Sequence, residues 1–167
     1  MSVPGEASGA IEARVRATLE ALGGPYELIA CDPALADTAA FCEAYGIPLD
    51  RSANCIVVAS KGEPKQHVAC LVLATNRLDV NGVVRRLMGA RKASFAPAEE
   101  TATLTGMMIG GVTPLGLPEG IPIYLDAAMM PLDAVVVGGG SRSLKVRLAP
   151  ALLARLPGAQ VVEGLGI

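Results

Sequence analysis

Residues 109–118, "IGGVTPLGLP", could do chemistry with their backbone rather than with their side chains. The segment holds three glycines and two prolines between an apolar stretch and the strand-like run at 121–127. Glycine has no Cβ, so another group can approach its backbone closely, and successive glycines can aim N–H groups at one anion. Gly110, Gly111 and Pro114 could form a rigid cradle for an anion or for a developing oxyanion. The same residues would also make a tight structural loop, and glycine and proline content alone favours that simpler reading.

A second glycine cluster, "VGGGSR" at 137–142, follows a strand-like apolar run. It lacks the G-x-G-x-x-G spacing, and no long helix follows it. Both features argue against a dinucleotide site.

Charge is distributed unevenly along a chain whose net charge is −2. Residues 1–50 carry two basic and eight acidic side chains, a balance of −6. Residues 51–92 carry eight basic and two acidic side chains, a balance of +6. A basic segment in an acidic protein can contact a polyanion, but it can equally be the solvated face of a helix, and charge alone does not separate these readings.

Four cysteines and one histidine are the candidate metal ligands. No cysteine pair has C-x-x-C spacing, and a zinc site would need its ligands clustered in sequence or supplied by several loops. We therefore expect no metal and no cofactor. The interpretation we favour is that the thiols are small buried apolar groups in a reducing compartment. These residues are Cys31, Cys42, Cys55, Cys70 and His67.

Hydrophobic periodicity and cap residues outline the elements that would position these groups. Asp37, Asp79 and Pro97 are placed to begin helices, and Gly46 and Gly89 to end them. Two strongly apolar strands at 54–60 and 67–74 are joined by a turn containing Gly and Pro, which predicts a hairpin with at least one strand buried on both faces. The predicted helices are 10–24, 37–46, 78–92, 97–106 and 150–156, and the predicted strands are 26–30, 54–60, 67–74, 93–96, 121–127, 133–140, 143–149 and 159–163.

The length of 167 residues suits one domain, which we expect to span 1–167, with 1–9 as a candidate disordered segment. The mixture of hairpins and helices favours an α+β (mixed α/β) fold over a doubly wound parallel sheet. The longest apolar runs, such as 69–74, are far shorter than the ~20 residues of a membrane span. No signal peptide is visible at the N-terminus, so we expect a cytoplasmic protein that does not enter a membrane.

Four segments occur in an order typical of one known family: "LDVNGVVRRLMGARKASFA", "TGMMIGGVTPLG", "IPIYLDA" and "VVVGGGSRSLKVRLAPALLARL". The chain resembles the YbaK/ProX (EbsC-like) family of free-standing aminoacyl-tRNA deacylases, whose fold is also inserted in bacterial prolyl-tRNA synthetases. The resemblance covers about 36–163 and is strongest from residue 78 onward. Gly110 and Pro114 match the Gly-x-x-x-Pro motif of the family, with Thr113 where the family usually has Ser or Thr.

The resemblance implies a single compact domain with a curved mixed sheet or partial barrel surrounded by helices. It implies metal-free hydrolysis of the ester of a mischarged tRNA, typically tRNA(Pro) carrying a small residue such as Ala or Cys. The partners would be the tRNA acceptor end and, transiently, an aminoacyl-tRNA synthetase or an elongation factor. The implied catalytic residues are Asn54 and Gly110; the substrate-binding residues are Gly111, Thr113, Pro114, Asp126, Gly139 and Arg142; the tRNA-binding residues are Arg85, Arg86, Arg91 and Lys92.

The sequence departs from the family pattern at Asn54, where the family places a lysine. Asn54 can donate a hydrogen bond but carries no charge, and Arg51 is a cation near it in sequence. The aromatic pocket residues of the family are also missing near the N-terminus, where only Phe41 is available. Two readings stay open: a deacylase in which Asn54 polarises the ester, and a non-catalytic protein of the same fold that binds a nucleotide, an aminoacyl ester or the tRNA end. A DNA-binding regulator is disfavoured, because no helix-turn-helix is visible and the protein is acidic overall.

Overall fold

The computed structural model describes residues 4–167, which form eight strands and five α-helices with four short helical turns. The strands are β1 (Tyr26–Ala30), β2 (Ala53–Ser60), β3 (His67–Leu73), β4 (Ala93–Phe95), β5 (Ile123–Asp126), β6 (Val135–Gly138), β7 (Leu144–Leu148) and β8 (Ala159–Val162). The α-helices are α1 (Pro4–Leu22), α2 (Thr38–Tyr45), α3 (Arg85–Met88), α4 (Ala98–Thr105) and α5 (Pro150–Leu153). The short turns are η1 (Pro33–Leu35), η2 (Leu49–Arg51), η3 (Val80–Val84) and η4 (Ala127–Met129).

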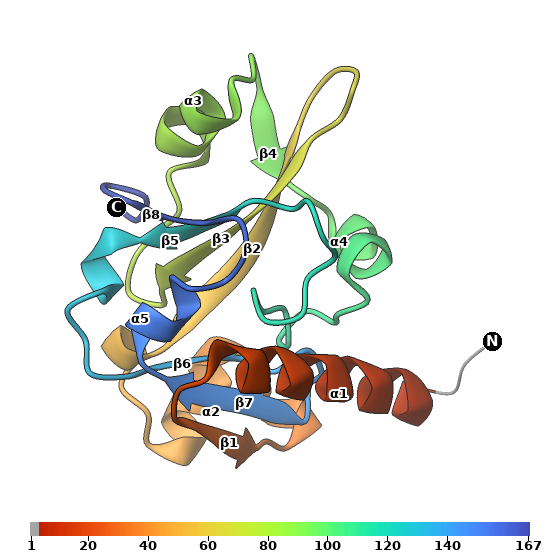
Figure 1. The fold of residues 1–167 in the computed structure, drawn as a ribbon, viewed down its shortest axis with the longest axis vertical. Coiled ribbons are helices and arrows are strands. Elements are labelled where there is room, and N and C mark those ends of the chain that lie inside the picture. The colour runs from red at the N-terminus through yellow and green to blue at the C-terminus, as the bar shows by residue number, and fades with distance from the viewer. Residues whose placement is uncertain (1–3) are drawn as a thin grey trace.

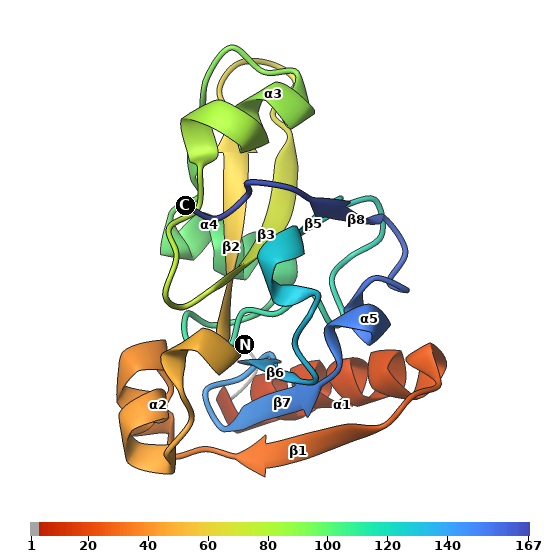
Figure 2. The same ribbon diagram turned by 90° about the vertical axis from the view of Figure 1, so that its left-hand side faces the viewer.

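The strands form two sheets. The smaller sheet is antiparallel, in the order β1-β7-β6, and the larger sheet is mixed, in the order β4-β2-β3-β5-β8, with β5 parallel to both of its neighbours. A parallel bridge between Ser52 and Val136 connects the two sheets. The smaller sheet and α1 lie at one end of the molecule, and α3 with the tip of the β2–β3 hairpin lies at the other (Figures 1 and 2).

The main apolar core lies between α1 and the two sheets. Val15 and Leu19 of α1 pack with Leu71 of β3 and Val146 of β7, and all four are at most 1% exposed. Strand β3 lies between β2 and β5, and all its residues except His67 are buried, as its unbroken apolar sequence predicts. The fold class predicted from the sequence, a mixed α/β domain, is confirmed, and its curved sheet takes the form of two bridged sheets.

The outer face of the smaller sheet is covered by α2. Phe41 and Cys42 of this helix pack against Val136 of β6 and against Ile29 of β1. Gly46 ends the helix with a φ of 69°, as predicted. Asp37 occupies the position before the helix, but its side chain makes no capping hydrogen bond. No helix in the described part of the chain is long and apolar enough to cross a membrane.

Three predicted helices differ from the structure by more than one residue at an end. The helix predicted at 150–156 ends at Leu153. Helix α1 begins at Pro4, so the helix covers most of the candidate disordered segment, and residues 1–3 lie outside the described residues. The predicted helix at 78–92 is shorter and is not regular: a π-helical turn at Val80–Val84 precedes α3. Asp79 accepts hydrogen bonds from the amides of Gly82 and Val83, so its predicted cap is confirmed on a wider turn.

Candidate active site

A cavity of about 270 Å³ lies between the first half of β2, the start of α2 and the glycine-rich loop. Its walls come from distant parts of the chain and from both sheets, because Gly138 of β6 and Lys145 of β7 also contribute. Asp37 and Lys145 are the only charged residues among the described residues that line it. The lining residues are Asp37, Thr38, Ala53, Asn54, Cys55, Ile56, Val57, Ala96, Thr101, Ile109, Gly110, Val112, Gly138 and Lys145.

Gly110 and Val112 of the glycine-rich loop line this cavity. Within residues 4–167, neither amide N–H of these two residues donates a hydrogen bond to a protein acceptor. Gly110 has a φ of 92°, which only glycine adopts easily. Gly111 has a different role: its amide donates to the carbonyl of Met108, and a Cβ built on it would lie 2.4 Å from the carbonyl oxygen of Ser141. Gly111 therefore allows close backbone packing, and Gly110 and Val112 offer the amides.

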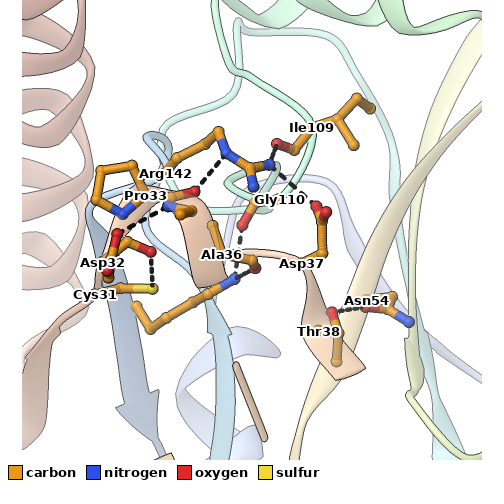
Figure 3. A network of polar contacts seen from close by, with 12 residues as sticks. Cys31, Asp32, Pro33, Ala36, Asp37, Thr38, Asn54, Ile109, Gly110 and Arg142 are labelled. Atoms are coloured by element: carbon orange, nitrogen blue, oxygen red, sulfur yellow. Dashed lines mark hydrogen bonds and ion pairs between the residues drawn. The ribbon is translucent and has the colours of Figure 1, made fainter. Parts of the chain in front are cut away.

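Asn54, near the start of β2, lines the same cavity as Gly110. The Thr38 hydroxyl, at the first position of α2, donates a hydrogen bond to Asn54 Oδ1. Figure 3 shows the amide nitrogen of Asn54 turned away from Thr38. Among the described residues this nitrogen has no protein acceptor, so its N–H groups are available to a ligand.

Arg142, in the turn between β6 and β7, fastens the loops around the cavity rather than lining it (Figure 3). Its Nε donates to the carbonyl of Pro33 at 2.9 Å, and its Nη1 donates to the carbonyl of Ile109 at 2.7 Å. The same Nη1 lies 3.0 Å from the Asp37 carboxylate, whose side chain is 70% exposed. Because these bonds join the glycine-rich loop to the start of α2, Arg142 sets the shape of the cavity.

Lys145 is the cation of the cavity. It is 5% exposed, and its Nζ donates to the carbonyl of Ala36 at 2.7 Å and to the carbonyl of Gly110 at 2.6 Å. The ring of Phe41 lies 5.3 Å from Nζ, so the predicted aromatic residue lies beneath the ammonium and outside the cavity lining. Burial lowers the pKa of Lys145 below its ordinary value. The ionisable groups that act on it are Cys31, Arg142, Asp37 and Cys42.

The thiol in the cavity wall belongs to Cys55. Desolvation raises the pKa of this thiol to about 12, so it stays protonated near neutral pH and does not act as a thiolate nucleophile. Burial raises the pKa of Cys70 as well. No group of three or more potential metal ligands occurs among the described residues.

None of the six predicted substrate-binding residues belongs to the cavity lining. Gly111 and Arg142 are described above, and four remain. The Thr113 side chain is buried and accepts from the amide of Leu115, and Pro114 lines a separate apolar groove beside α1. Gly139 packs against Leu144, while its neighbour Gly138 lines the cavity. These residues shape the loops that carry the site.

Asp126, at the end of β5, is the fourth. It is 1% exposed, and its Oδ1 accepts from the amide of Ala128 to cap η4. Its Oδ2 has no hydrogen-bond partner among the described residues. This carboxylate therefore caps a short helical turn at the end of β5 and lies outside the cavity lining.

The sequence profile of the family described as the aminoacyl-tRNA editing domain matches residues 32–156. The chain belongs to the aminoacyl-tRNA editing domain family. The family resemblance noted in the sequence is thereby confirmed.

Relatives of this editing domain are both free-standing and fused. It is 26% identical over 122 residues to a protein of Enterococcus faecalis described as a candidate Cys-tRNA(Pro)/Cys-tRNA(Cys) deacylase, EbsC, and the match covers 72% of each chain. A proline–tRNA ligase of Burkholderia multivorans is 28% identical over 107 residues, which are 64% of this chain and 18% of the ligase. A solved structure described as a candidate trans-editing enzyme for prolyl tRNA synthetase has a TM-score of 0.77 and 29% identity, with 98% of each chain covered.

The four basic residues predicted to contact tRNA lie on α3 and on the loop that follows it. Arg86, Arg91 and Lys92 are exposed, whereas Arg85 is half-buried and donates to the backbone carbonyls of Asn81 and Ala90. Arg85 therefore satisfies local carbonyls near the end of a helix, and three of the four predicted basic residues present their charge to solvent.

The site residue that sequence reasoning missed is Lys145. In the run "SLKVRLA" it alternates with Leu144 and Val146, which is the pattern of an exposed side chain on a half-buried strand. This alternation correctly places Lys145 on the outer face of the smaller sheet. The side chain is nevertheless buried, because α2 and the residues before it cover that face at Lys145. Arg51, the cation considered near Asn54, lines a different hollow with Asp133 and Arg147.

Proposed function

We propose that this protein hydrolyses the ester bond of a mischarged aminoacyl-tRNA. The observation that carries the proposal is a single one: Gly110 and Val112 line a small cavity together with Asn54, and within residues 4–167 neither backbone amide donates to a protein acceptor. Together they offer several N–H donors in one place, which is how enzymes stabilise the negative oxygen of an acyl-transfer intermediate.

The reaction places the ester carbonyl of the substrate beside these donors. A water oxygen adds to the carbonyl carbon, and the carbonyl oxygen becomes the oxyanion that the N–H groups stabilise. The bond to the terminal ribose oxygen then breaks, and that oxygen takes the proton that the water loses. The products are the free amino acid and the uncharged tRNA. Cys55 takes no covalent part, since its thiol remains protonated.

The cavity volume supports a small aminoacyl group. About 270 Å³ lies just below the ~300–1,000 Å³ of typical ligand pockets. Apolar side chains of β2 and of the loop, including Val57, Ile109 and Val112, form much of the wall. The small residues that prolyl-tRNA synthetase fails to exclude are the substrates we propose, with tRNA(Pro) as the carrier, because the solved relative is described as a trans-editing enzyme for that synthetase. Exclusion by size is worth only ~1–3 kcal/mol per methylene, which is why a separate editing step is needed.

Docking of the tRNA would use the exposed basic residues Arg86, Arg91 and Lys92. Phosphate contacts are sequence-independent, so this surface would orient the acceptor stem while the cavity reads the amino acid. We propose that the protein acts in the cytoplasm and meets its substrate on release from a synthetase or before capture by an elongation factor.

The test is a hydrolysis assay on tRNA(Pro) charged with Ala, Cys, Ser or Pro, with tRNA(Ala) and tRNA(Cys) charged with their own residues beside it. We expect release of a small non-cognate residue from tRNA(Pro) and no release of proline. Gly110→Ala perturbs the glycine-rich loop, and its folding is checked by urea unfolding. Gly120→Ala, at a glycine of similar φ, controls for backbone strain alone. Absence of hydrolysis across the panel would refute the proposal.

A second function, binding without turnover, is favoured by one observation. Asn54 is uncharged, and one of its two polar atoms is already bonded to Thr38. A binding protein would retain affinity for a non-hydrolysable 3′-aminoacylamido-adenosine while showing no hydrolysis of any charged tRNA. Asn54→Ala would weaken that affinity, whereas Asn54→Lys would produce no turnover.

A further inference from the structure

We infer that Lys145 of β7 supplies the positive charge of the cavity, in place of the lysine that the family resemblance led us to expect at Asn54. The inference rests on the proposed function, which it deepens by naming the cation that acts on the ester end of the ligand. Lys145 is the single basic residue among the described residues that line the cavity. Its Nζ donates to the carbonyl of Gly110, a residue of the glycine-rich loop that lines the same cavity.

The position of the ammonium is defined by three groups. The carbonyls of Ala36 and Gly110 accept two of its hydrogen bonds, at 2.7 and 2.6 Å, and the ring of Phe41 lies 5.3 Å from it. An ammonium carries three N–H donors, and among the described residues the third has no carbonyl or carboxylate acceptor. That donor is the one we assign to the ligand.

The groups around Lys145 favour its charged form, although burial opposes that form. Desolvation lowers its pKa, but two backbone carbonyls and an aromatic face stabilise the ammonium. A largely buried cation acts on a developing negative charge more strongly than one in water does, because the effective dielectric constant around it is lower. The cavity wall is therefore a suitable place for an otherwise costly charge.

The other cations near the site do not line the cavity. Arg142 gives its Nε to Pro33 and its Nη1 to Ile109 and Asp37, and it does not line the cavity. Arg51 lies in a separate hollow. The positive charge in the cavity thus comes from the smaller sheet, whereas a lysine at the position of Asn54 would have come from the larger one.

In the proposed hydrolysis, Lys145 neither accepts nor donates a proton over the full reaction. Water adds to the carbonyl carbon, the ammonium and the loop amides stabilise the oxyanion, and the ribose oxygen leaves with the proton from water. If Lys145 contacts the oxyanion, a cation that reaches the same oxygen from another wall of the cavity can restore the rate. If Lys145 only holds the loops together through the carbonyls of Ala36 and Gly110, such a cation cannot restore the rate.

The experiment compares the wild-type protein with Lys145→Met, with Asn54→Lys and with the double variant. Lys145→Gln is the second probe of the same position, since its side-chain amide still offers donors for the two carbonyls but carries no charge. Arg147→Met is the matched control: Arg147 is a cation on the same face of β7, paired with Glu27 and absent from the cavity. Thermal unfolding of every variant reports whether it is folded.

We expect Lys145→Met and Lys145→Gln to lower the hydrolysis rate by ~10²–10³-fold, the usual effect of removing one donor to an oxyanion. Arg147→Met should retain the wild-type rate. Asn54→Lys should restore most of the rate in the Lys145→Met background and change it little in the wild type. A rate of Lys145→Gln equal to that of Arg147→Met would overturn the inference, and so would a folded double variant without recovery.

If the wild-type protein hydrolyses no charged tRNA, the proposed function is refuted, but the role of Lys145 can still be tested by binding. The readout is then the affinity for 3′-aminoacylamido-adenosine, a non-hydrolysable mimic of the charged tRNA end. Weakening by about tenfold or more in Lys145→Gln, with recovery on adding Asn54→Lys, would support the assignment of the cation. Equal affinity in the wild type and Lys145→Gln would overturn it.

Discussion

Replacement of Gly110 by alanine should destabilise the protein for two separable reasons. The resulting movement of the glycine-rich loop should also lower the activity. The φ of 92° at Gly110 is unfavourable for any residue with a Cβ. A Cβ built there would also lie 2.5 Å from Nη1 of Arg142, so the guanidinium would have to move away from the glycine-rich loop.

The magnitude follows from these two terms. The left-handed conformation costs an alanine ~1–2 kcal/mol. Displacing Arg142 removes its bond to the carbonyl of Ile109, which is worth about 1.5–3 kcal/mol as a charged hydrogen bond. Its ion pair with Asp37 adds at most about 1 kcal/mol, because that carboxylate is largely exposed. We therefore expect Gly110→Ala to destabilise the fold by about 3–5 kcal/mol.

The difference in stability between Gly110→Ala and Gly120→Ala isolates the second term, the loss of the Arg142 bonds. Gly120 has a φ of 88°, and a Cβ built on it meets nothing within 4 Å. Urea unfolding of both variants should show Gly110→Ala less stable by about 2–3 kcal/mol, equivalent to roughly 4–12 °C in Tm for a chain of this size. Equal unfolding midpoints would refute the reasoning, because they would mean that the Arg142 bonds to the loop add no stability.

Other perturbations give further tests. Asn54→Ala should lower hydrolysis by ~10²–10³-fold if its amide stabilises the oxyanion, and Asn54→Lys should preserve or raise it, as measured by release of the amino acid. Arg86→Ala and Lys92→Ala should each weaken tRNA binding and reduce the slope of log K against log salt by about 1, and unchanged slopes would show that these residues are only solvated. Because burial lowers the folded-state pKa of Lys145, the unfolded chain binds more protons between that pKa and 10.5, so wild-type stability gains a contribution as pH rises through this window. Lys145→Met should lack that gain in urea midpoints measured across the alkaline range, and an identical pH dependence would contradict the assigned burial effect.

Local sequence patterns were sufficient where one element decides the structure. Asp79 caps its helix and Gly89 ends it because both effects depend on a few neighbouring residues. The unbroken apolar run of β3 predicts burial on both faces without reference to its partners. The π-helical turn at Val80–Val84 was beyond this reasoning, since apolar spacing does not separate a single wide turn from an α-helical one.

The candidate site was predicted only where a backbone motif marks it. Gly110 is recognisable from its spacing to Pro114, and Asn54 from its place in the family pattern. Lys145 carries no local signal, because its burial depends on α2, more than a hundred residues earlier in the chain. Asp126 and Thr113 were predicted to bind substrate because they lie in or beside segments that resemble the family. In the structure, their side-chain oxygens instead accept hydrogen bonds from backbone amides two residues later.

The walls of the cavity belong to both sheets, so any molecule bound there holds the two sheets together. Such a ligand binds the folded protein and not the unfolded chain, and at 100 times its Kd it should add about 2.7 kcal/mol to the free energy of unfolding. For a chain of this length that corresponds to roughly 5–11 °C in Tm. Candidate aminoacyl groups can therefore be ranked by the thermal shift that their adenosine amides produce, without preparing a single mischarged tRNA.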